Sequence, residues 1–212
     1  MAGRFITLEG IEGAGKSTVA KFVCEWLTSR GVTVCATREP GGTPLAERVR
    51  ELVLNRHDEP ITPATETLLM FAARGLHVAN LIRPALERGE WVVCDRFTDA
   101  TRAYQGGGRG VSLEWIDQLA GIVQAGLHPD RTLLLDLPVA TGLERVRQRS
   151  GSTIPTDRFE EEPARFFERV RETYLALAQA APARIRIIDA SRSLEEVRGE
   201  VAETLATLLK GA

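Results

Sequence analysis

Eight residues near the amino terminus have the types and spacing of a phosphate-binding loop. They are Gly10-Ile11-Glu12-Gly13-Ala14-Gly15-Lys16-Ser17, which fit the pattern G-x-x-x-x-G-K-[ST]. The glycines let the backbone wrap closely around a phosphate, whose oxygens the wrapped N–H groups bind. Lys16 is expected to reach the β- and γ-phosphates of a nucleotide, and the Ser17 hydroxyl to ligate Mg²⁺. We therefore predict a nucleotide site that also includes the adjacent Thr18.

The sequence on either side of this loop supplies the context that the motif requires. Residues 5–8 form a short β-rich run leading directly into the loop, and residues 17–27 read as a helix leaving it. In such a strand–loop–helix unit the amino terminus of the helix presents its positive dipole to the anion. This context makes a chance match of glycines a poor explanation.

Composition limits the class of protein. The chain has 212 residues, 43% hydrophobic and 26% charged, which suits one globular domain over residues 1–212. A net charge of −2 argues against a nucleic-acid or anionic-membrane partner. Three cysteines without metal-binding spacing indicate thiols in a reducing cytoplasm. The chain shows neither a signal peptide nor an apolar run of about 20 residues, so we expect no membrane segment.

Strand-like and helix-like stretches alternate along the chain. This alternation predicts an α/β fold, a three-layer sandwich with a central parallel sheet, and places active residues at the carboxyl ends of its strands. A helix that begins at Thr62-Pro63 is expected to reach about residue 88, with Pro84 as a possible kink or break. The remaining strands are predicted at residues 32–37, 91–95, 132–136 and 184–188, and the remaining helices at 45–54, 112–124, 139–148, 163–180 and 194–209.

Two of these predicted strands end in aspartate, Asp95 and Asp136. Either carboxylate can hold Mg²⁺ or simply cap the turn that follows. Arg96 follows Asp95 directly, which places a charge and its counter-charge at one strand end. Because a metal and a phosphate would both bind at that edge, we favour Asp95 over Asp136 as the metal residue.

Two further segments have functional residue types at suggestive positions. Arg38-Glu39-Pro40-Gly41-Gly42 follows a strand, and its arginine is more than a turn requires. Phe71 and Arg74 lie three residues apart on one helix face. A flat ring beside a guanidinium can stack on and hydrogen-bond a nucleobase, although a helical Phe more often packs in the core.

Four arginines, Arg145, Arg147, Arg149 and Arg158, gather around an expected loop over residues 149–158. Exposed loops are commonly charged, so these side chains can simply be solvated. Near a phosphate site they can instead belong to a lid, here residues 145–160, that closes over the transferred group. We favour Arg149 as the acting cation, since it sits where helix gives way to loop. Arg158 comes second because Asp157 can hold it in an ion pair.

Six motifs in this order resemble the thymidylate kinase family, bacterial type, over essentially the whole chain. The resemblance implies a nucleoside monophosphate kinase fold of the P-loop NTPase type. It also implies transfer of the γ-phosphoryl group of ATP to dTMP, giving dTDP, with Mg²⁺ and in a homodimer. The matching motifs are Gly10-Ile11-Glu12-Gly13-Ala14-Gly15-Lys16-Ser17, Arg38-Glu39-Pro40-Gly41-Gly42, Phe71-Ala72-Ala73-Arg74, Asp95-Arg96-Phe97, Ala103-Tyr104-Gln105-Gly106 and Asp157-Arg158-Phe159-Glu160.

The resemblance also implies roles for residues that match the family's motifs. Glu12 is implied near the sugar 3′-hydroxyl, Phe71 stacked on thymine and Arg74 bonded to a thymine carbonyl. Arg38 and Arg96 are implied at the acceptor phosphate. The implied substrate-binding set is Glu12, Arg38, Pro40, Phe71, Arg74, Arg96, Thr101, Tyr104 and Gln105, with Thr101 and Tyr104 near the base and the 2′ carbon; the implied catalytic set is Lys16, Arg96, Arg149 and Glu12.

Members of the family place their catalytic cation in one of two ways. Some have an arginine beside the acidic residue of the phosphate-binding loop, and others have glycine there and basic residues in the lid. Gly13 and the lid arginines are similar to the second kind. The insert Gly151-Ser152-Thr153-Ile154-Pro155-Thr156 looks longer than some family lids, so the arginine that reaches the phosphates stays open.

Three alternatives remain beside this interpretation. One is a kinase for another nucleoside monophosphate or a deoxynucleoside, although Arg74 only donates hydrogen bonds and so fits a 4-carbonyl better than a 4-amino group. Another is a GTP-binding switch, whose usual N-K-x-D motif is not found in this sequence. The third is a P-loop ATPase subunit acting on nucleic acid, which the near-neutral charge disfavours.

Overall fold

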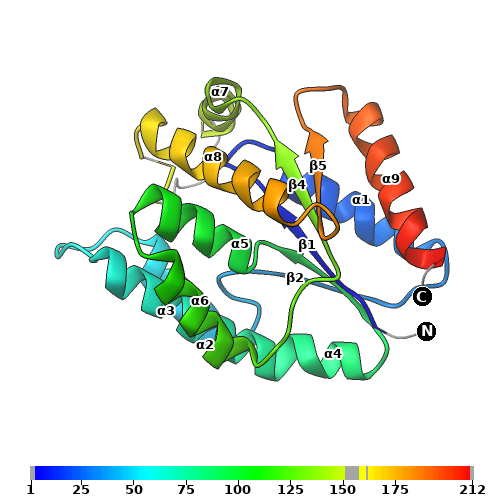
Figure 1. The fold of residues 1–212 in the computed structure, drawn as a ribbon, viewed down its shortest axis with the longest axis horizontal. Coiled ribbons are helices and arrows are strands. Elements are labelled where there is room, and N and C mark those ends of the chain that lie inside the picture. Colours follow the sequence, from blue (N-terminus) through cyan, green and yellow to red (C-terminus); the bar gives the residue numbers. More distant parts are fainter. Residues whose placement is uncertain (1–2, 151–157, 161, 211–212) are drawn as a thin grey trace.

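A parallel β-sheet forms the centre of the molecule (Figure 1). The computed structural model describes residues 3–150, 158–160 and 162–210, without the side chains of residues 149 and 150. Within these ranges the sheet has five strands in the order β2-β3-β1-β4-β5. In the register, Leu8 and Arg38 both pair with Asp95, so β1, β2 and β3 end together at one edge. The strands are β1 (Phe5–Glu9), β2 (Val34–Arg38), β3 (Trp91–Asp95), β4 (Arg131–Asp136) and β5 (Ile185–Asp189).

Helices cover both faces of the sheet, as the predicted three-layer α/β sandwich requires. On one face, α1 (Lys16–Thr28) and α9 (Leu194–Lys210) pack side by side, and their apolar residues join those of the strands in one buried cluster. On the other face, α8 (Ala164–Ala180) packs against β4 and β5. The same side of the sheet carries α2 (Pro44–Leu54) and α6 (Leu113–Gln124), with α7 (Val139–Ser150) packed on α8.

Most strand and helix predictions are confirmed with small shifts at their ends. The second strand begins at Val34 rather than residue 32, because the Val32 amide donates to Leu27 O in the turn that closes α1 (3.2 Å). The expected loop over residues 149–158 is wrong at its start, since α7 continues through Ser150. No described helix has the combination of length and apolarity needed to cross a bilayer.

The long predicted helix over residues 62–88 consists of three helical segments. Thr62 caps its start by accepting from the Thr65 amide (3.2 Å), as predicted. The widened π-helical turns of η1 come directly before Pro84, which has no N–H to donate back along an α-helix. The expected kink is therefore a local widening rather than a break. The segments are α3 (Pro63–His77), η1 (Val78–Ile82) and α4 (Arg83–Glu87).

The sequence analysis missed a helical stretch after β3. It consists of α5 (Thr98–Thr101) and the π-helical η2 (Arg102–Gly108). Three consecutive glycines at residues 106–108 disfavour a helix by intrinsic propensity. Tertiary packing overrides that tendency, because α8 lies so close that a Cβ at Gly107 would collide with Thr173 and one at Gly108 with Phe166. This helix carries Thr101, Tyr104 and Gln105 to the site described next.

Candidate active site

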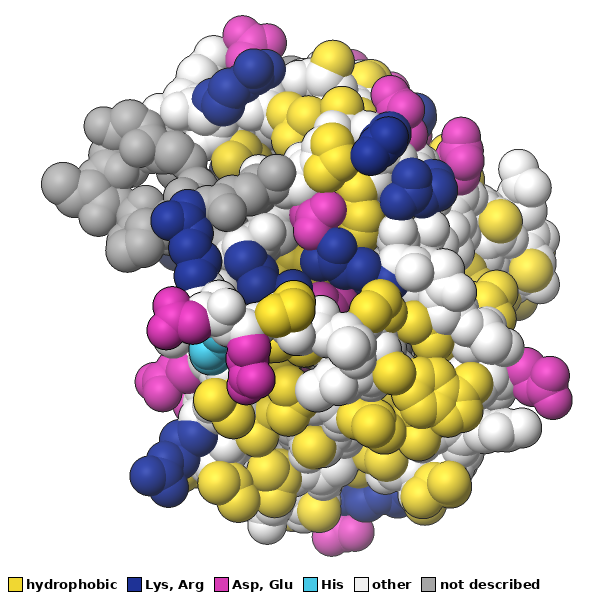
Figure 2. Space-filling view, turned by 90° about the vertical axis from the view of Figure 1, so that its left-hand side faces the viewer, with side chains coloured by type: hydrophobic (Ala, Val, Ile, Leu, Met, Phe, Trp, Pro, Cys, Tyr) yellow, Lys and Arg dark blue, Asp and Glu magenta, His cyan; other side chains and the backbone are white. Residues whose placement is uncertain are grey.

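A cavity of about 420 Å³ lies at the carboxyl ends of β1, β2 and β3. Its walls come from the phosphate-binding loop, the turn after β2, α3, the helix after β3, and α7. Figure 2 shows Lys and Arg side chains gathered across the middle of the face that the cavity opens on. Most predicted site residues line it: Glu12, Gly13, Gly15, Lys16, Ser17, Thr18, Arg38, Pro40, Arg74, Asp95, Arg96, Thr101, Tyr104, Gln105 and Arg145.

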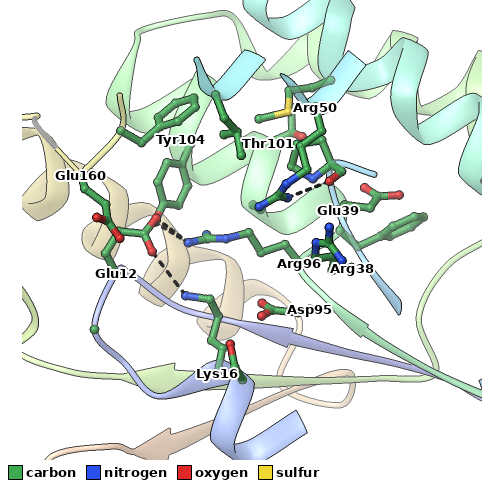
Figure 3. Close-up of a pocket in the computed structure, with 18 of the residues that line it drawn as sticks. Glu12, Lys16, Arg38, Glu39, Arg50, Asp95, Arg96, Thr101, Tyr104 and Glu160 are labelled. Carbon is green, nitrogen blue, oxygen red and sulfur yellow. Dashed lines mark hydrogen bonds and ion pairs between the residues drawn. The ribbon is translucent and has the colours of Figure 1, made fainter. Parts of the chain in front are cut away.

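The phosphate-binding loop folds its own lysine inward. Lys16 Nζ donates to Gly10 O (3.1 Å) and Ile11 O (2.9 Å), and lies 3.9 Å from the Glu12 carboxylate (Figure 3). Burial, and then the charge of Arg96, lower the pKa of Lys16, while Glu12 opposes the shift. A bound phosphate would supply the anion that favours the charged lysine. Lys16 is thus a buried cation held by carbonyl oxygens that a phosphate can replace.

Glycine at position 13 lets α7 pack directly on the loop. Gly13 has φ 76°, and a Cβ there would collide with the carbonyl oxygen of Gly142. The close approach requires glycine on the helix side as well, because a Cβ on Gly142 would lie 2.6 Å from Glu12 O. An arginine at position 13 would therefore displace α7, the helix that carries Arg145, Arg147 and Arg149. This packing agrees with the expectation that the catalytic arginine comes from α7 or the residues after it, and not from the phosphate-binding loop.

The four lid arginines lie in different surroundings. Arg145 lines the cavity and donates to Gly13 O (3.4 Å) and Ala190 O (3.3 Å). Arg147 is exposed. Arg158 donates to Glu66 (2.6 Å) and packs over the ring of Phe159, so its carboxylate partner here belongs to α3. The Arg149 side chain, Asp157 and the insert at 151–156 lie outside the described residues.

Arg96 and Glu12 point toward one another across the cavity (Figure 3). Arg96 Nη2 donates to Glu12 Oε1 (2.7 Å) and to the Tyr104 hydroxyl (3.1 Å), and its Nη1 donates to Gly10 O (3.3 Å). The guanidinium also lies 4.6 Å from the Tyr104 ring centroid. The Arg96 backbone has φ 72°, which side-chain-bearing residues seldom adopt outside functional sites.

Glu9, which the sequence analysis missed, holds this unusual backbone. Its Oε1 accepts from the Phe97 amide (2.7 Å), and its Oε2 accepts from the Tyr174 hydroxyl (2.7 Å). Burial, and then the charge of Asp99, raise the pKa of Glu9 to about 8, although Arg96 and both hydrogen bonds oppose the shift. The criterion that selected Asp95, an acid at a strand end, would have found Glu9 at the end of β1.

The two aspartates considered for Mg²⁺ have different surroundings in the structure. Both carboxylate oxygens of Asp136 accept from Arg171 (2.7 and 2.8 Å). Asp95 lines the cavity, and its buried Oδ1 has no hydrogen-bond partner among the described residues. Ser17 lines the same cavity. A carboxylate oxygen and a hydroxyl beside a phosphate site fit Mg²⁺, which keeps several waters and shares substrate oxygens. The geometry favours Asp95.

Arg74 lies at the opposite end of the cavity. It is 3% exposed, and donates from Nε to Glu39 (2.7 Å) and from Nη2 to Thr101 (3.0 Å). Its Nη1 is buried and has no hydrogen-bond partner within the described part of the chain. Gln105 is similar: its Nε2 donates to Glu66 (2.8 Å), while its buried Oε1 has no partner in the described residues. A donor and an acceptor are thus available to a ligand at this end.

Phe71 and two arginines differ in their relation to the cavity. Phe71 is buried in a cluster with Ile116 and Ala120, and its ring lies 4.8 Å from the Arg74 guanidinium. It is absent from the described cavity lining, so its stacking role stays a prediction. Arg38 lines the cavity while donating to Glu47 (3.0 Å). Arg50, a lining residue that the sequence analysis did not select, donates to Pro40 O (2.8 Å).

Comparisons with known proteins agree with this geometry. The thymidylate kinase family model matches residues 8–201. The chain is 58% identical to a thymidylate kinase of Chromohalobacter salexigens, over 98% of this chain and 97% of that one. It is 56% identical to one from Methylococcus capsulatus, over 99% and 98% of the two chains. A crystal structure of thymidylate kinase from Ehrlichia chaffeensis superimposes with a TM-score of 0.77 at 33% identity, covering 97% of this chain and 99% of that chain. The chain belongs to the thymidylate kinase family.

Proposed function

We propose that this protein is a dTMP kinase, a transferase that moves the γ-phosphoryl group of ATP to dTMP and forms dTDP. One observation carries the proposal: a single cavity holds the lysine of the phosphate-binding loop, a second cation at a strand end, and a buried arginine with a spare donor. These groups suit, in order, the donor phosphates, the acceptor phosphate and a base carbonyl. The family membership supports the same reaction.

The chemistry of the step is mostly positioning and charge neutralisation. Phosphoryl transfer through a loose transition state requires the attacking oxygen and the leaving oxygen in line, with little covalent participation by the protein. The acceptor phosphate is already ionised near neutral pH, so no general base is needed. Two anions must nevertheless approach each other. Lys16 on the donor side, with Arg96 and Arg38 on the acceptor side, supplies countercharge from three walls of the cavity.

Glu12 and Tyr104 fit the sugar of the acceptor. The Glu12 carboxylate accepts from both Arg96 (2.7 Å) and the Tyr104 hydroxyl (3.2 Å), and can equally accept from a sugar hydroxyl. We assign the 3′-hydroxyl to Glu12. The Tyr104 ring is 5% exposed and packed against Phe159, Phe166 and Tyr174, so it forms a rigid wall for the 2′ carbon.

Asp95 and Ser17 are the residues that would hold Mg²⁺, directly or through water. When bound, the ion would supply positive charge that offsets the repulsion between the phosphates. Among the described residues no cluster of three or more His, Cys, Asp or Glu side chains is arranged to hold a metal. Asp95 and Ser17 would therefore be the protein's contribution to a Mg²⁺ site that otherwise depends on the substrate and water.

Two further features of the protein are proposed: a homodimer and a cytoplasmic location. Apolar side chains gather on the face formed by α3 and α6, the lower half of Figure 2. Leu68 on α3 is 49% exposed and Ile122 on α6 is 78% exposed, which suits burial against a second copy. Ile122→Asp should then give monomers in analytical ultracentrifugation, while Leu194→Asp on distant α9 should not. The location rests on Cys24, Cys35 and Cys94, which are free thiols in the described structure.

The activity is tested with a coupled ADP-release assay. The acceptors are dTMP, dUMP, dCMP, AMP and GMP, each with ATP and Mg²⁺. We expect dTMP to give the highest kcat/KM, with dUMP next, because both bases carry the 4-carbonyl that Arg74 can bond. Turnover of AMP or GMP at comparable efficiency would instead indicate a kinase for another nucleotide. ATP hydrolysis that needs no acceptor and rises with nucleic acid would indicate an ATPase subunit.

A further inference from the structure

A buried chain of hydrogen bonds runs from β2 through α3 to the guanidinium of Arg74. It involves Thr37, Glu39 and His77, none of which the sequence analysis assigned to the site. We propose that Glu39 and His77 are positioning residues that fix the angle of Arg74 and thereby set the selectivity for a base with a 4-carbonyl over one with a 4-amino group. The proposal rests on the proposed function, since it concerns how the acceptor base is read.

Glu39 fixes Arg74 because neither of its oxygens is free to turn. Oε2 accepts from Arg74 Nε at 2.7 Å, and Oε1 lies 3.0 Å from His77 Nδ1. The Glu39 side chain is 4% exposed and that of Arg74 is 3% exposed. A buried carboxylate with a donor on each oxygen cannot rotate without leaving one of them unpaired, which is costly away from water.

His77 in turn fixes Glu39. Because a carboxylate only accepts, Nδ1 carries the proton and donates to Glu39, and Nε2 shares a hydrogen bond with the Thr37 hydroxyl (2.7 Å). The imidazole is fully buried. Gly42, with φ 87°, closes over it so tightly that a Cβ there would lie 2.5 Å from Nε2. The Gly42 amide is itself held by Glu47 (2.8 Å). The turn after β2 therefore also encloses the His77 ring.

This arrangement leaves one nitrogen of Arg74 for a ligand. Nε binds Glu39 and Nη2 binds Thr101, whereas Nη1 is the one guanidinium nitrogen without a partner among the described residues. A fixed donor suits a carbonyl at position 4 of a pyrimidine. An amino group at position 4 would place a second donor against Nη1 and offer it no acceptor. A looser Arg74 could swing away and tolerate that amino group, so rigidity and selectivity are coupled.

The test compares dUMP with dCMP, whose bases differ at position 4, a carbonyl or an amino group, and at N3, which carries a proton only in uracil. The parent enzyme and the variants His77→Leu, His77→Asn and Glu39→Gln are assayed for kcat and KM with each, and both nucleotides are titrated directly by calorimetry. We expect His77→Leu to lower the dUMP-to-dCMP ratio of kcat/KM about tenfold, mainly through KM for dUMP. His77→Asn should restore most of the ratio, because its amide nitrogen can replace Nδ1 as a donor.

Glu39→Gln keeps the result informative if His77→Leu does not fold. The Glu39 carboxylate accepts from both Arg74 and His77, whereas a glutamine amide can accept from only one of them. The dUMP-to-dCMP ratio of kcat/KM should therefore again fall about tenfold. A folded His77→Leu or Glu39→Gln enzyme with an unchanged ratio, or with equal losses for both nucleotides, would overturn the inference. Failure of the proposed function is seen separately, as a parent enzyme that phosphorylates neither dTMP nor dUMP.

Discussion

The two ends of the cavity hold their cations in different ways. At the base end, Arg74 is fixed by buried side chains, Glu39 at 2.7 Å and Thr101 at 3.0 Å. At the phosphate end, Lys16 donates to two backbone carbonyl oxygens of the loop, at 2.9 and 3.1 Å. Arg96 beside it donates to Glu12 (2.7 Å), to the Tyr104 hydroxyl (3.1 Å) and to Gly10 O (3.3 Å). On the proposed function, the contacts of Arg74 can stay in place when a base binds, whereas Lys16 would exchange its carbonyl partners for phosphate oxygens. A fixed donor would then bind the neutral base, and cations that can be released would bind the charged phosphates.

This difference predicts that variants at the phosphate end lower turnover without changing base selectivity. Variants around Arg74 should do the reverse.

Lys16→Ala should reduce kcat by about 10³-fold or more, since a cation at the β- and γ-phosphates stabilises the transition state by several kcal/mol. Thermal melting should show a folded protein. Lys21→Ala on the same helix is the control, because Lys21 is 79% exposed and pairs only with Glu25 in the described structure. A Lys16→Ala enzyme with half the parent activity would remove Lys16 from the mechanism.

Arg149→Ala should reduce kcat by about 10³-fold, the lower end of the range for an arginine that stabilises a transferred phosphoryl group. Binding of dTMP, measured by titration, should change little. Arg147→Ala and Arg158→Ala are assayed beside it, and Arg158→Ala should act mainly on stability, through loss of its ion pair with buried Glu66. If all three variants turn over within a fewfold of the parent, the cation comes from elsewhere.

Arg96→Ala should lower kcat/KM for dTMP by about 10²-fold, because it removes an oriented charge from the acceptor site. ATP binding, titrated without dTMP, should stay near that of the parent. Arg88→Ala, which removes an exposed arginine paired with Glu90, is the matched control. A collapse of ATP binding in Arg96→Ala would move this residue to the donor site.

Glu9 predicts a pH dependence of stability. Its pKa is raised from 4.5 to about 8 in the folded protein, so the folded chain keeps a proton that the unfolded chain loses. Stability from this group therefore falls as pH rises from about 4.5 to about 8. Glu9→Gln keeps an acceptor for the Phe97 amide and removes the ionisation. The unfolding free energy of Glu9→Gln minus that of the parent should therefore increase by on the order of 3 kcal/mol between pH 5 and pH 8.

Chemical denaturation at pH 5, 6, 7 and 8 measures this gain. Glu87→Gln, an exposed acid at the end of α4, is the control and should track the parent at every pH. A gap between Glu9→Gln and the parent that does not widen with pH would mean that Glu9 is ionised throughout the range.

Tyr104→Ala should narrow the preference for dTMP over its ribose analogue by about tenfold, because the ring packed at the 2′ carbon leaves no room for a hydroxyl. Tyr104→Phe is the matched variant: it keeps the ring and loses only the hydroxyl bonds to Glu12 and Arg96. It should keep the parent's preference. If Tyr104→Phe and Tyr104→Ala lose the preference equally, the hydroxyl rather than the ring excludes the ribose.

Local signals in the sequence predicted much of this molecule. The spacing of Gly10, Lys16 and Ser17 identified the phosphate-binding loop, because its function depends on consecutive backbone groups. Short β-rich runs identified all five strands of the described sheet. The runs at 91–95 and 132–136 were apolar as well, since a buried parallel strand leaves little room for polar residues. Thr62 followed by Pro63 marked the start of α3, because the cap bond spans three residues.

Other features depended on residues far apart in the sequence. Glycines 106–108 argued against a helix that the packing of α8 then imposed. Both Asp95 and Asp136 were candidate strand-end acids, and only the neighbouring Arg96 favoured Asp95. In the structure Arg171, 35 residues from Asp136, pairs with the Asp136 carboxylate. No role was predicted for Glu66 on α3, yet its carboxylate accepts a hydrogen bond from Arg158, 92 residues away. The local sequence around such a residue does not indicate which distant residue it will contact.

The sequence by itself determined the chemistry of the phosphate end and the α/β order of the chain, because loop, strand and cap each arise from contiguous residues. Only the tertiary structure decided how Arg74 is held. Glu39 meets Arg74 across 35 residues and His77 across 38, and their geometry exists only once β2 and α3 pack together. A buried carboxylate is stable there because both donors reach it at once, a condition that no local pattern encodes.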